Sequence, residues 1–235
     1  MGLSIHYSGK IADKGMLPKL IEEVEEIAKV HGWKYSIYEQ KFPDDSGLEE
    51  HFDRSLLNRS ANHDGKLYGI DFTPKGSEPI SIAFLINGRM SSIIQLCCWG
   101  EFKEEKQILI NNANVNEQGE LEMHDEELII TADYYQRYLY KCSSKTQYAG
   151  LEAHEMTIGV FRYLNKNFLK DFEMTDEGYY WETNDKVLLK KTFERYTSLI
   201  NGFATALSKN NKKQGEELDA YLERVIREFR EKNKE

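Results

Sequence analysis

The stretch LSIHYSGKIADKGMLPKLIEEVEEIAKVHGWKYSIYEQ, residues 3–40, decides the fold of this chain. Its first six residues alternate apolar and polar side chains, which is typical of a half-buried strand. Apolar side chains then recur at steps of three and four over residues 17–28, with Pro18 in the first turn and Gly32 at the exit. This spacing predicts an amphipathic helix. Alternation resumes over residues 34–40 and predicts a second strand.

Three further strands are predicted at residues 67–72, 80–86 and 91–99. The dipeptide Asn87-Gly88 separates the second from the third, and this dipeptide strongly favours a tight hairpin. Such short connections cannot hold a crossover helix, which a parallel pair of strands would need. This part of the sheet is therefore expected to be antiparallel.

Helical spacing returns in the second half of the chain. Residues 150–168 form a predicted helix, and two more follow near the C-terminus. Their apolar side chains step by four and three; they are Leu189, Phe193, Tyr196, Ile200, Phe203 and Leu207 in the first helix and Leu218, Leu222, Val225 and Phe229 in the second. Two antiparallel helices would join along these stripes or lie on the sheet. The same stripes would also suit a contact between two copies of the chain.

These elements predict an α+β fold: a largely antiparallel sheet, helices mainly on one face, and a C-terminal antiparallel helical hairpin. Residues 1–184 are expected to form one α+β domain. Residues 185–235 are expected to form the helical hairpin packed on that domain.

Composition limits the classes of partner. The chain has 40 acidic and 31 basic residues, a formal net charge of −9, which would repel a phosphate backbone. We therefore expect no nucleic-acid binding. No apolar run approaches the roughly 18 residues of a membrane span, so no membrane association is expected. The three cysteines have no disulfide-framework spacing and suggest reduced thiols in a cytoplasmic protein.

The run DEGYYWETND lies in a predicted hairpin over residues 172–183, and the loop length decides which side chains share a face. A three-residue loop would force Glu182 onto the apolar face, where desolvation raises a carboxyl pKa as a general acid requires. A four-residue loop would place Glu173, Tyr180 and Glu182 together on the polar face. Burying an unpaired carboxylate costs several kcal/mol. The four-residue loop is therefore favoured, and those three side chains are the ones expected to meet a ligand.

His154 is the one histidine on the inward stripe of the predicted helix over residues 150–168. Such a histidine is more often a hydrogen-bonded core residue than a catalytic base. The catalytic alternative pairs His154 with Glu177 or Glu182 in a hydrolase-like site. The chain lacks a dinucleotide fingerprint, a nucleophile elbow, the kinase motifs and a zinc-protease helix motif. No cofactor and no metal site are predicted.

The leading hypothesis is a non-catalytic binding or protein-interaction module with a tyrosine-rich surface. Tyrosine suits such surfaces because it combines apolar area with a hydroxyl group. The expected ligand-binding residues are Tyr134, Tyr135, Tyr138, Glu173 and Tyr180. The outer face of the C-terminal helices is a second candidate surface, and it would support a homodimer. The partner, a protein or a small molecule, stays open.

Two alternatives remain beside this hypothesis. The first is the hydrolase-like enzyme, which needs His154 and a carboxylate within hydrogen-bond reach at the floor of a concave pocket. The second is an acidic inhibitor that steers towards a basic protein. The interaction hypothesis instead needs an exposed apolar patch, or a symmetric contact that buries about 1,000 Å² or more.

Overall fold

A computed structural model describes residues 3–44, 65–98 and 138–232. The fold is α+β, as predicted, and the described strands form two antiparallel sheets. The three-stranded sheet has the order β6-β1-β7, and the four-stranded sheet has the order β2-β3-β4-β5. The strands are β1 (Ser4–Ile11), β2 (Lys34–Ile37), β3 (Tyr68–Thr73), β4 (Ile80–Phe84), β5 (Met90–Ser91), β6 (Cys142–Lys145) and β7 (Leu169–Asp176).

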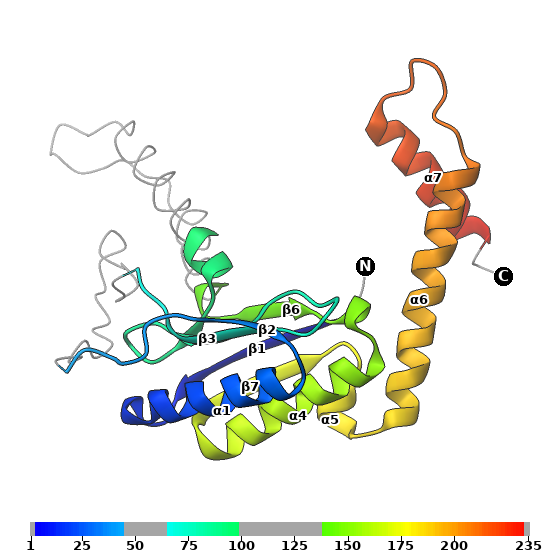
Figure 1. Ribbon diagram of the computed structural model, residues 1–235. Coiled ribbons are helices and arrows are strands. Elements are labelled where there is room, and N and C mark those ends of the chain that lie inside the picture. The colour runs from blue at the N-terminus through cyan, green and yellow to red at the C-terminus, as the bar shows by residue number, and fades with distance from the viewer. Residues whose placement is uncertain (1–2, 45–64, 99–137, 233–235) are drawn as a thin grey trace, which may run out of the picture.

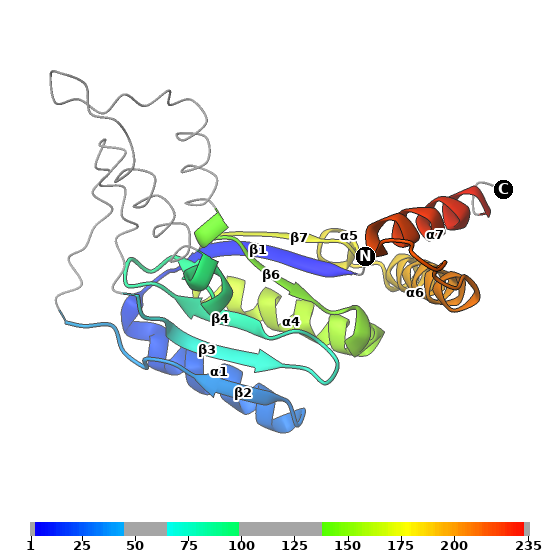
Figure 2. The same ribbon diagram turned by 90° about the horizontal axis from the view of Figure 1, so that it is seen from above.

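The two sheets lie edge to edge in one layer (Figure 2), and β1 is the strand that links them. Its end pairs with the four-stranded sheet through an antiparallel bridge between Lys10 and Arg89 and a 2.9 Å bond from the Ile11 N–H to the carbonyl of Gly88. The Tyr7 hydroxyl also connects β1 to β4. It donates to the Ser81 carbonyl and accepts from the Ser81 N–H.

Helices α1 (Leu17–Val30) and α4 (Leu151–Asn167) cover the same face of this layer (Figures 1 and 2). The predicted stripe of α1 is buried, since Leu17, Leu20 and Val24 are no more than 1 % exposed. One hydrophobic cluster joins both helices to both sheets. The placement of helices mainly on one face is confirmed.

The hairpin predicted at Asn87-Gly88 is present, but its second arm is short. Gly88 adopts φ +81°, and β4 and β5 pair on either side of it. Only Met90 and Ser91 form the returning strand, and residues 93–98 are helical. The prediction of a strand over residues 91–99 was therefore wrong. A run of apolar residues is compatible with either structure, and its periodicity does not decide between them.

The hairpin predicted over residues 172–183 was also wrong. Strand β7 is its first arm, but the chain then turns into the short helix α5 (Tyr180–Thr183). Tyr179, at φ +60°, makes the turn. The Asp176 side chain accepts backbone N–H groups of the turn, and such local bonds compete with strand pairing.

The C-terminal antiparallel helical hairpin is confirmed and stands out from the sheets (Figure 1). It consists of α6 (Lys186–Lys209) and α7 (Leu218–Lys232). Asp185 caps α6, because its carboxylate accepts the N–H groups of residues 187 and 188. Leu189 and Phe193 are buried in the body, whereas the later part of α6 packs with α7. We call α6 and α7 together the arm.

Among the described residues, no helix combines the length and the apolar character needed to cross a bilayer.

Candidate functional site

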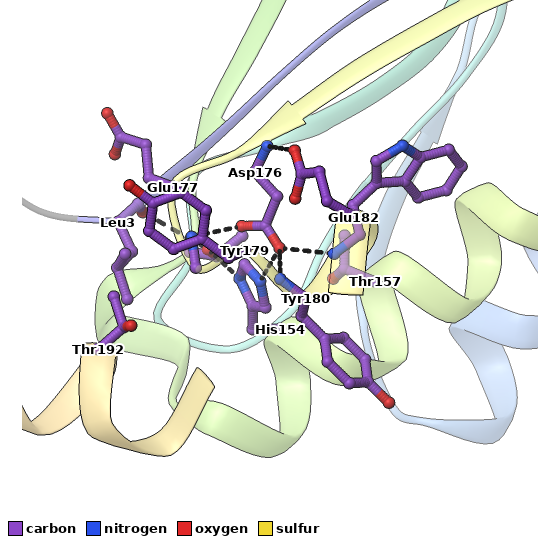
Figure 3. A network of polar contacts seen from close by, with 12 residues as sticks. Leu3, His154, Thr157, Asp176, Glu177, Tyr179, Tyr180, Glu182 and Thr192 are labelled. Carbon is purple, nitrogen blue, oxygen red and sulfur yellow. Dashed lines mark hydrogen bonds and ion pairs between the residues drawn. The ribbon is translucent and has the colours of Figure 1, made fainter. Parts of the chain in front are cut away.

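A histidine and an aspartate form a buried pair where β7 meets α4. His154 lies in α4, and Asp176 is the last residue of β7. The Nε2 atom of His154 lies 3.2 Å from Oδ2 of Asp176, and both side chains are fully buried. On the other side of the ring, Nδ1 lies 2.8 Å from the hydroxyl of Thr146. Figure 3 shows the imidazole and the carboxylate facing each other beneath the turn.

The turn after β7 surrounds the Asp176 carboxylate with donors. The backbone N–H groups of Gly178, Tyr180 and Trp181 donate to it over 2.7, 2.8 and 3.1 Å. Burial raises the pKa of Asp176, but the hydrogen bond and charge of His154, with the backbone donors, outweigh burial and hold this pKa below its ordinary value. The carboxylate is therefore ionised at neutral pH.

The hydrogen bonds of His154 use both ring nitrogens. An ionised Asp176 only accepts, so Nε2 of His154 carries a proton and donates to it, while Nδ1 is hydrogen-bonded to the Thr146 hydroxyl. A hydroxyl, an imidazole and a carboxylate in this order also make up a hydrolase triad. Here, however, Thr146 is only 1 % exposed and His154 is fully buried, so the hydroxyl is closed off from solvent. The arrangement leaves no position for a substrate next to the hydroxyl.

The carboxylates predicted to partner His154 lie elsewhere. Glu182 is exposed, and its Oε1 accepts the backbone N–H of Asp176 at 3.1 Å. Oε2 of Glu177 accepts the backbone N–H of Ser4 at 2.7 Å. The structure thus pairs His154 with Asp176 and with neither of the predicted carboxylates. The sequence did contain an indication that Asp176 bonds to its own turn. It lies two residues before Gly178, and an aspartate in this position often accepts backbone N–H groups of the turn.

Thr146 and its neighbour Gln147 also hydrogen-bond to Leu3, the residue before β1. The Oε1 atom of Gln147 accepts the N–H of Leu3 at 3.0 Å, and its Nε2 donates to Thr197 of α6 at 3.2 Å. The Leu3 carbonyl accepts the N–H groups of Thr146 and Gln147. The polar groups therefore join β1, β7, α4 and α6, which is a structural role.

The predicted tyrosine-rich surface is not assembled by the described residues. Tyr134 and Tyr135 lie outside them, and Tyr138 is half-buried. Tyr180 is 7 % exposed, and the guanidinium carbon of Arg162 lies 5.1 Å from the centroid of its ring. Glu173 is exposed on β7. Tyr180 and Glu173 therefore do not share a face, because α5 replaces the second strand of the predicted hairpin.

A second buried carboxylate, Asp71, was missed from the sequence. It accepts the hydroxyls of Tyr38 and Ser81 at 2.7 and 2.6 Å. Burial raises the pKa of Asp71 more than these two hydrogen bonds lower it. The sequence indicated this buried carboxylate, because Asp71 lies within the apolar strand sequence LYGIDF. A charged group that is buried in a strand needs hydrogen-bond partners.

A groove with a volume of 760 Å³ follows α6. Leu151 and Phe193 supply apolar surface to it, and polar side chains of α6 also line it. Its two charged residues, Lys190 and Glu194, lie 3.9 Å apart as an exposed ion pair. His154 does not line this groove. The condition for a hydrolase, a histidine and a carboxylate on the floor of a pocket, is not met here.

Within the described ranges, no group of three or more His, Cys, Asp or Glu side chains is placed to hold a metal ion. Comparisons of the chain with protein-family models, with curated proteins and with solved structures found no match.

Proposed function

We propose that the protein is a non-catalytic interaction module whose working surface is the arm and whose partner is a second copy of the chain. The observation that carries this proposal is the partial burial of the apolar stripe of the arm. Two arms related by a two-fold axis would form a four-helix bundle, a common way for helical hairpins to bury such stripes.

The contact between α6 and α7 uses only part of that stripe. Phe203 and Phe229 meet edge to face with ring centroids 5.9 Å apart, and Val225 is fully buried. Gly202 permits the close approach, because a Cβ there would lie 2.9 Å from the Phe229 ring. Beyond this contact, Leu218 is 57 % exposed. Several other apolar side chains of the arm are half-buried, among them Leu199, Ile200, Leu207, Leu222 and Ile226.

The loop between the two helices is held in shape. The guanidinium of Arg224 donates to both carboxylate oxygens of Glu216 at 2.9 and 3.0 Å and to the carbonyl of Asn211 at 3.2 Å. A two-pronged contact of this kind fixes orientation as well as distance. The hairpin is thus preorganised, so less conformational entropy is lost when a partner binds.

Charge favours contact through the arm rather than through the body. Residues 1–185 have 19 basic and 32 acidic side chains, a net charge of −13, whereas residues 186–235 have 12 and 8, a net charge of +4. Two bodies would repel each other strongly. Two arms would repel only weakly, because both signs are interspersed along them.

The proposal is tested at Leu218, the first residue of α7, which is exposed in the single chain and belongs to the apolar stripe of the arm. Burying a leucine contributes about 1.5–3 kcal/mol, so Leu218→Glu should raise the dimer dissociation constant at least about tenfold. Sedimentation equilibrium measures that constant. The matched control is Val187→Glu, since Val187 is 64 % exposed but lies at the start of α6 beside the body. Equal effects of the two substitutions would contradict the proposal.

A further inference from the structure

Strand β7 lies at the margin of the sheet layer (Figure 2). Among the described strands, it pairs only with β1, and its other edge has no strand beside it. An edge strand presents unpaired backbone N–H and C=O groups, to which a further strand can be added. The outer edge of β7 is therefore a candidate surface for strand addition.

The hydrogen bonds at the end of β7 indicate which of its backbone groups face outward. The N–H of Glu177 donates to a carbonyl of β1, so the backbone of Glu177 faces β1. The N–H of Asp176 instead donates to Oε1 of Glu182 in α5, so the backbone of Asp176 faces away from β1. Successive residues of a strand direct these groups to opposite edges, so those of Met174 and Phe172 also face outward.

A β-bulge ends this regular stretch towards the start of β7. Ser8 pairs with Glu173 and Lys10 pairs with Lys170, so one residue of β1 faces two residues of β7. Within the bulge, Asp171 adopts φ +50°, in the left-handed region that aspartate tolerates better than most residues. The open part of the edge therefore lies between this bulge and the capped N–H at the end of the strand, and it suits a short extended segment.

On the face of β7 that is turned towards the helices, the edge is apolar. Phe172 and Met174 are half-buried and pack against the hydrophobic core. The Phe172 ring stacks on Phe161 of α4 and meets the Trp181 ring of α5 edge to face, with centroids 5.6 Å apart in both cases. An added strand would cover more of this surface, so its side chains on this face should be apolar.

On the opposite face, the edge is acidic. Asp171 and Glu173 are exposed there and share that face with Lys10 and Arg89. The two basic residues lie on the side of β7 away from its open edge, because β1 and the strands beyond it are on that side. Residues 1–185 also have a net charge of −13. Both the local and the overall charge favour basic side chains on this face of an added strand.

A second copy of the chain does not fit this edge. Two β7 strands paired about a two-fold axis at Phe172 would place Asp171 opposite the second copy's Glu173. An axis at Glu173 would place that carboxylate opposite its own copy. Like charges directly opposite each other destabilise a pair of strands. The edge therefore suits a different protein.

We propose that the outer edge of β7 binds an extended segment of another protein in which apolar and basic residues alternate. The main chain of the segment would pair with the outward-facing groups of Phe172 and Met174. Its apolar side chains would cover these two residues and Trp181, and its basic side chains would face Asp171 and Glu173. The edge belongs to the body, so this proposal does not depend on self-association through the arm.

Isothermal titration calorimetry of the full chain tests the proposal with a capped six-residue peptide of alternating lysine and valine. This peptide should bind. The same peptide with glutamate in place of lysine should bind at least about tenfold more weakly at low salt, because each charged pair across strands becomes repulsive. No binding of the lysine peptide, or equal binding of the two peptides, would overturn the proposal.

Two N-methylated forms of the lysine peptide test the main-chain pairing. The N–H groups of alternate residues in an extended chain point to the same edge, so methylation at every valine and methylation at every lysine block opposite edges. One form should bind at least about tenfold more weakly than the unmodified peptide, and the other should keep most of its affinity. Equal affinities of the two forms would contradict strand addition.

A charge reversal locates the binding. Glu173→Lys changes an exposed side chain, and it should weaken binding of the lysine peptide at least about threefold and strengthen binding of the glutamate peptide. The control is Glu26→Lys, which makes the same change of net charge at an exposed position of α1 and should leave both affinities unchanged. Unchanged affinities in Glu173→Lys, or equal shifts in the two variants, would rule out the proposed site.

Discussion

Two buried aspartates show how the donors around a carboxylate decide its role. Asp176 is surrounded by an imidazole and three backbone N–H groups, and its pKa is lowered. Asp71 has two hydroxyl donors, and its pKa is raised because burial outweighs them. The negative charge of Asp176 therefore stabilises the folded state, whereas that of Asp71 weakens it. Sequence reasoning favoured His154 as a hydrogen-bonded core residue, but its partner depends on a long-range pairing that no local pattern encodes.

The contrast predicts unequal costs of neutralising the two carboxylates. Asp176→Asn would place an amide among four donors, and we expect it to lower the free energy of unfolding by about 3–5 kcal/mol. Asp71→Asn should cost about 1 kcal/mol or less, because an amide can both accept from one hydroxyl and donate to the other. Urea unfolding at pH 7 measures both. Similar losses in the two variants would contradict the assigned roles.

The lowered pKa of Asp176 also predicts a dependence of stability on pH. Its stabilising contribution is fully present above the unfolded-state pKa of about 3.9 and is lost as the pH falls through the lower folded-state pKa. The difference in unfolding free energy between the wild type and Asp176→Asn should thus narrow below about pH 4. Urea titrations at a series of acidic pH values measure it. A difference that stays constant into strong acid would show that the ionised form is not the stabilising one.

At the scale of elements, periodicity predicted the regular segments and failed where side chains cap the backbone. Helix α1 and the start of β1 follow directly from their spacing. The segment after β7 does not follow from its spacing, because three successive aromatic residues fit a strand as well as a helical turn. The hydrogen bonds that the Asp176 side chain accepts from the backbone stabilise the turn instead of a second strand. The bulge beside Asp171 was equally hidden, since it appears only when the registers of β1 and β7 are compared.

Gly178 provides a test of the packing around this turn. A Cβ there would lie 2.6 Å from Leu189, 3.0 Å from the Asp176 carboxylate and 3.1 Å from the His154 ring. Gly178→Ala should therefore lower the free energy of unfolding by about 1–3 kcal/mol. Gly159 of α4 is the matched control, because a Cβ there would contact nothing within 4 Å.

In Gly159→Ala, the same substitution should stabilise the protein by about 0.5–1 kcal/mol through helix propensity. Thermal or urea unfolding of both variants gives the comparison. An equal response of the two glycines would show that the turn is not tightly packed.

At the scale of the whole molecule, the structure separates a body from an arm. The α+β class and the helical hairpin were predicted because each depends on local periodicity. The division into two sheets and the projection of the arm were not, because both depend on contacts between segments far apart in the chain, such as the bridge from Lys10 to Arg89. The arm keeps part of its apolar stripe uncovered and has a charge opposite to that of the body. These two properties are the basis for proposing self-association.

Hydrogen–deuterium exchange at increasing protein concentration tests self-association through the arm most directly, because it uses the unaltered chain and reports on each helix. Amides of α7 should exchange more slowly as the protein concentration rises, since a four-helix bundle would bury that helix, while amides of α1 should keep a constant rate. Exchange in α7 that does not change with concentration would contradict the account.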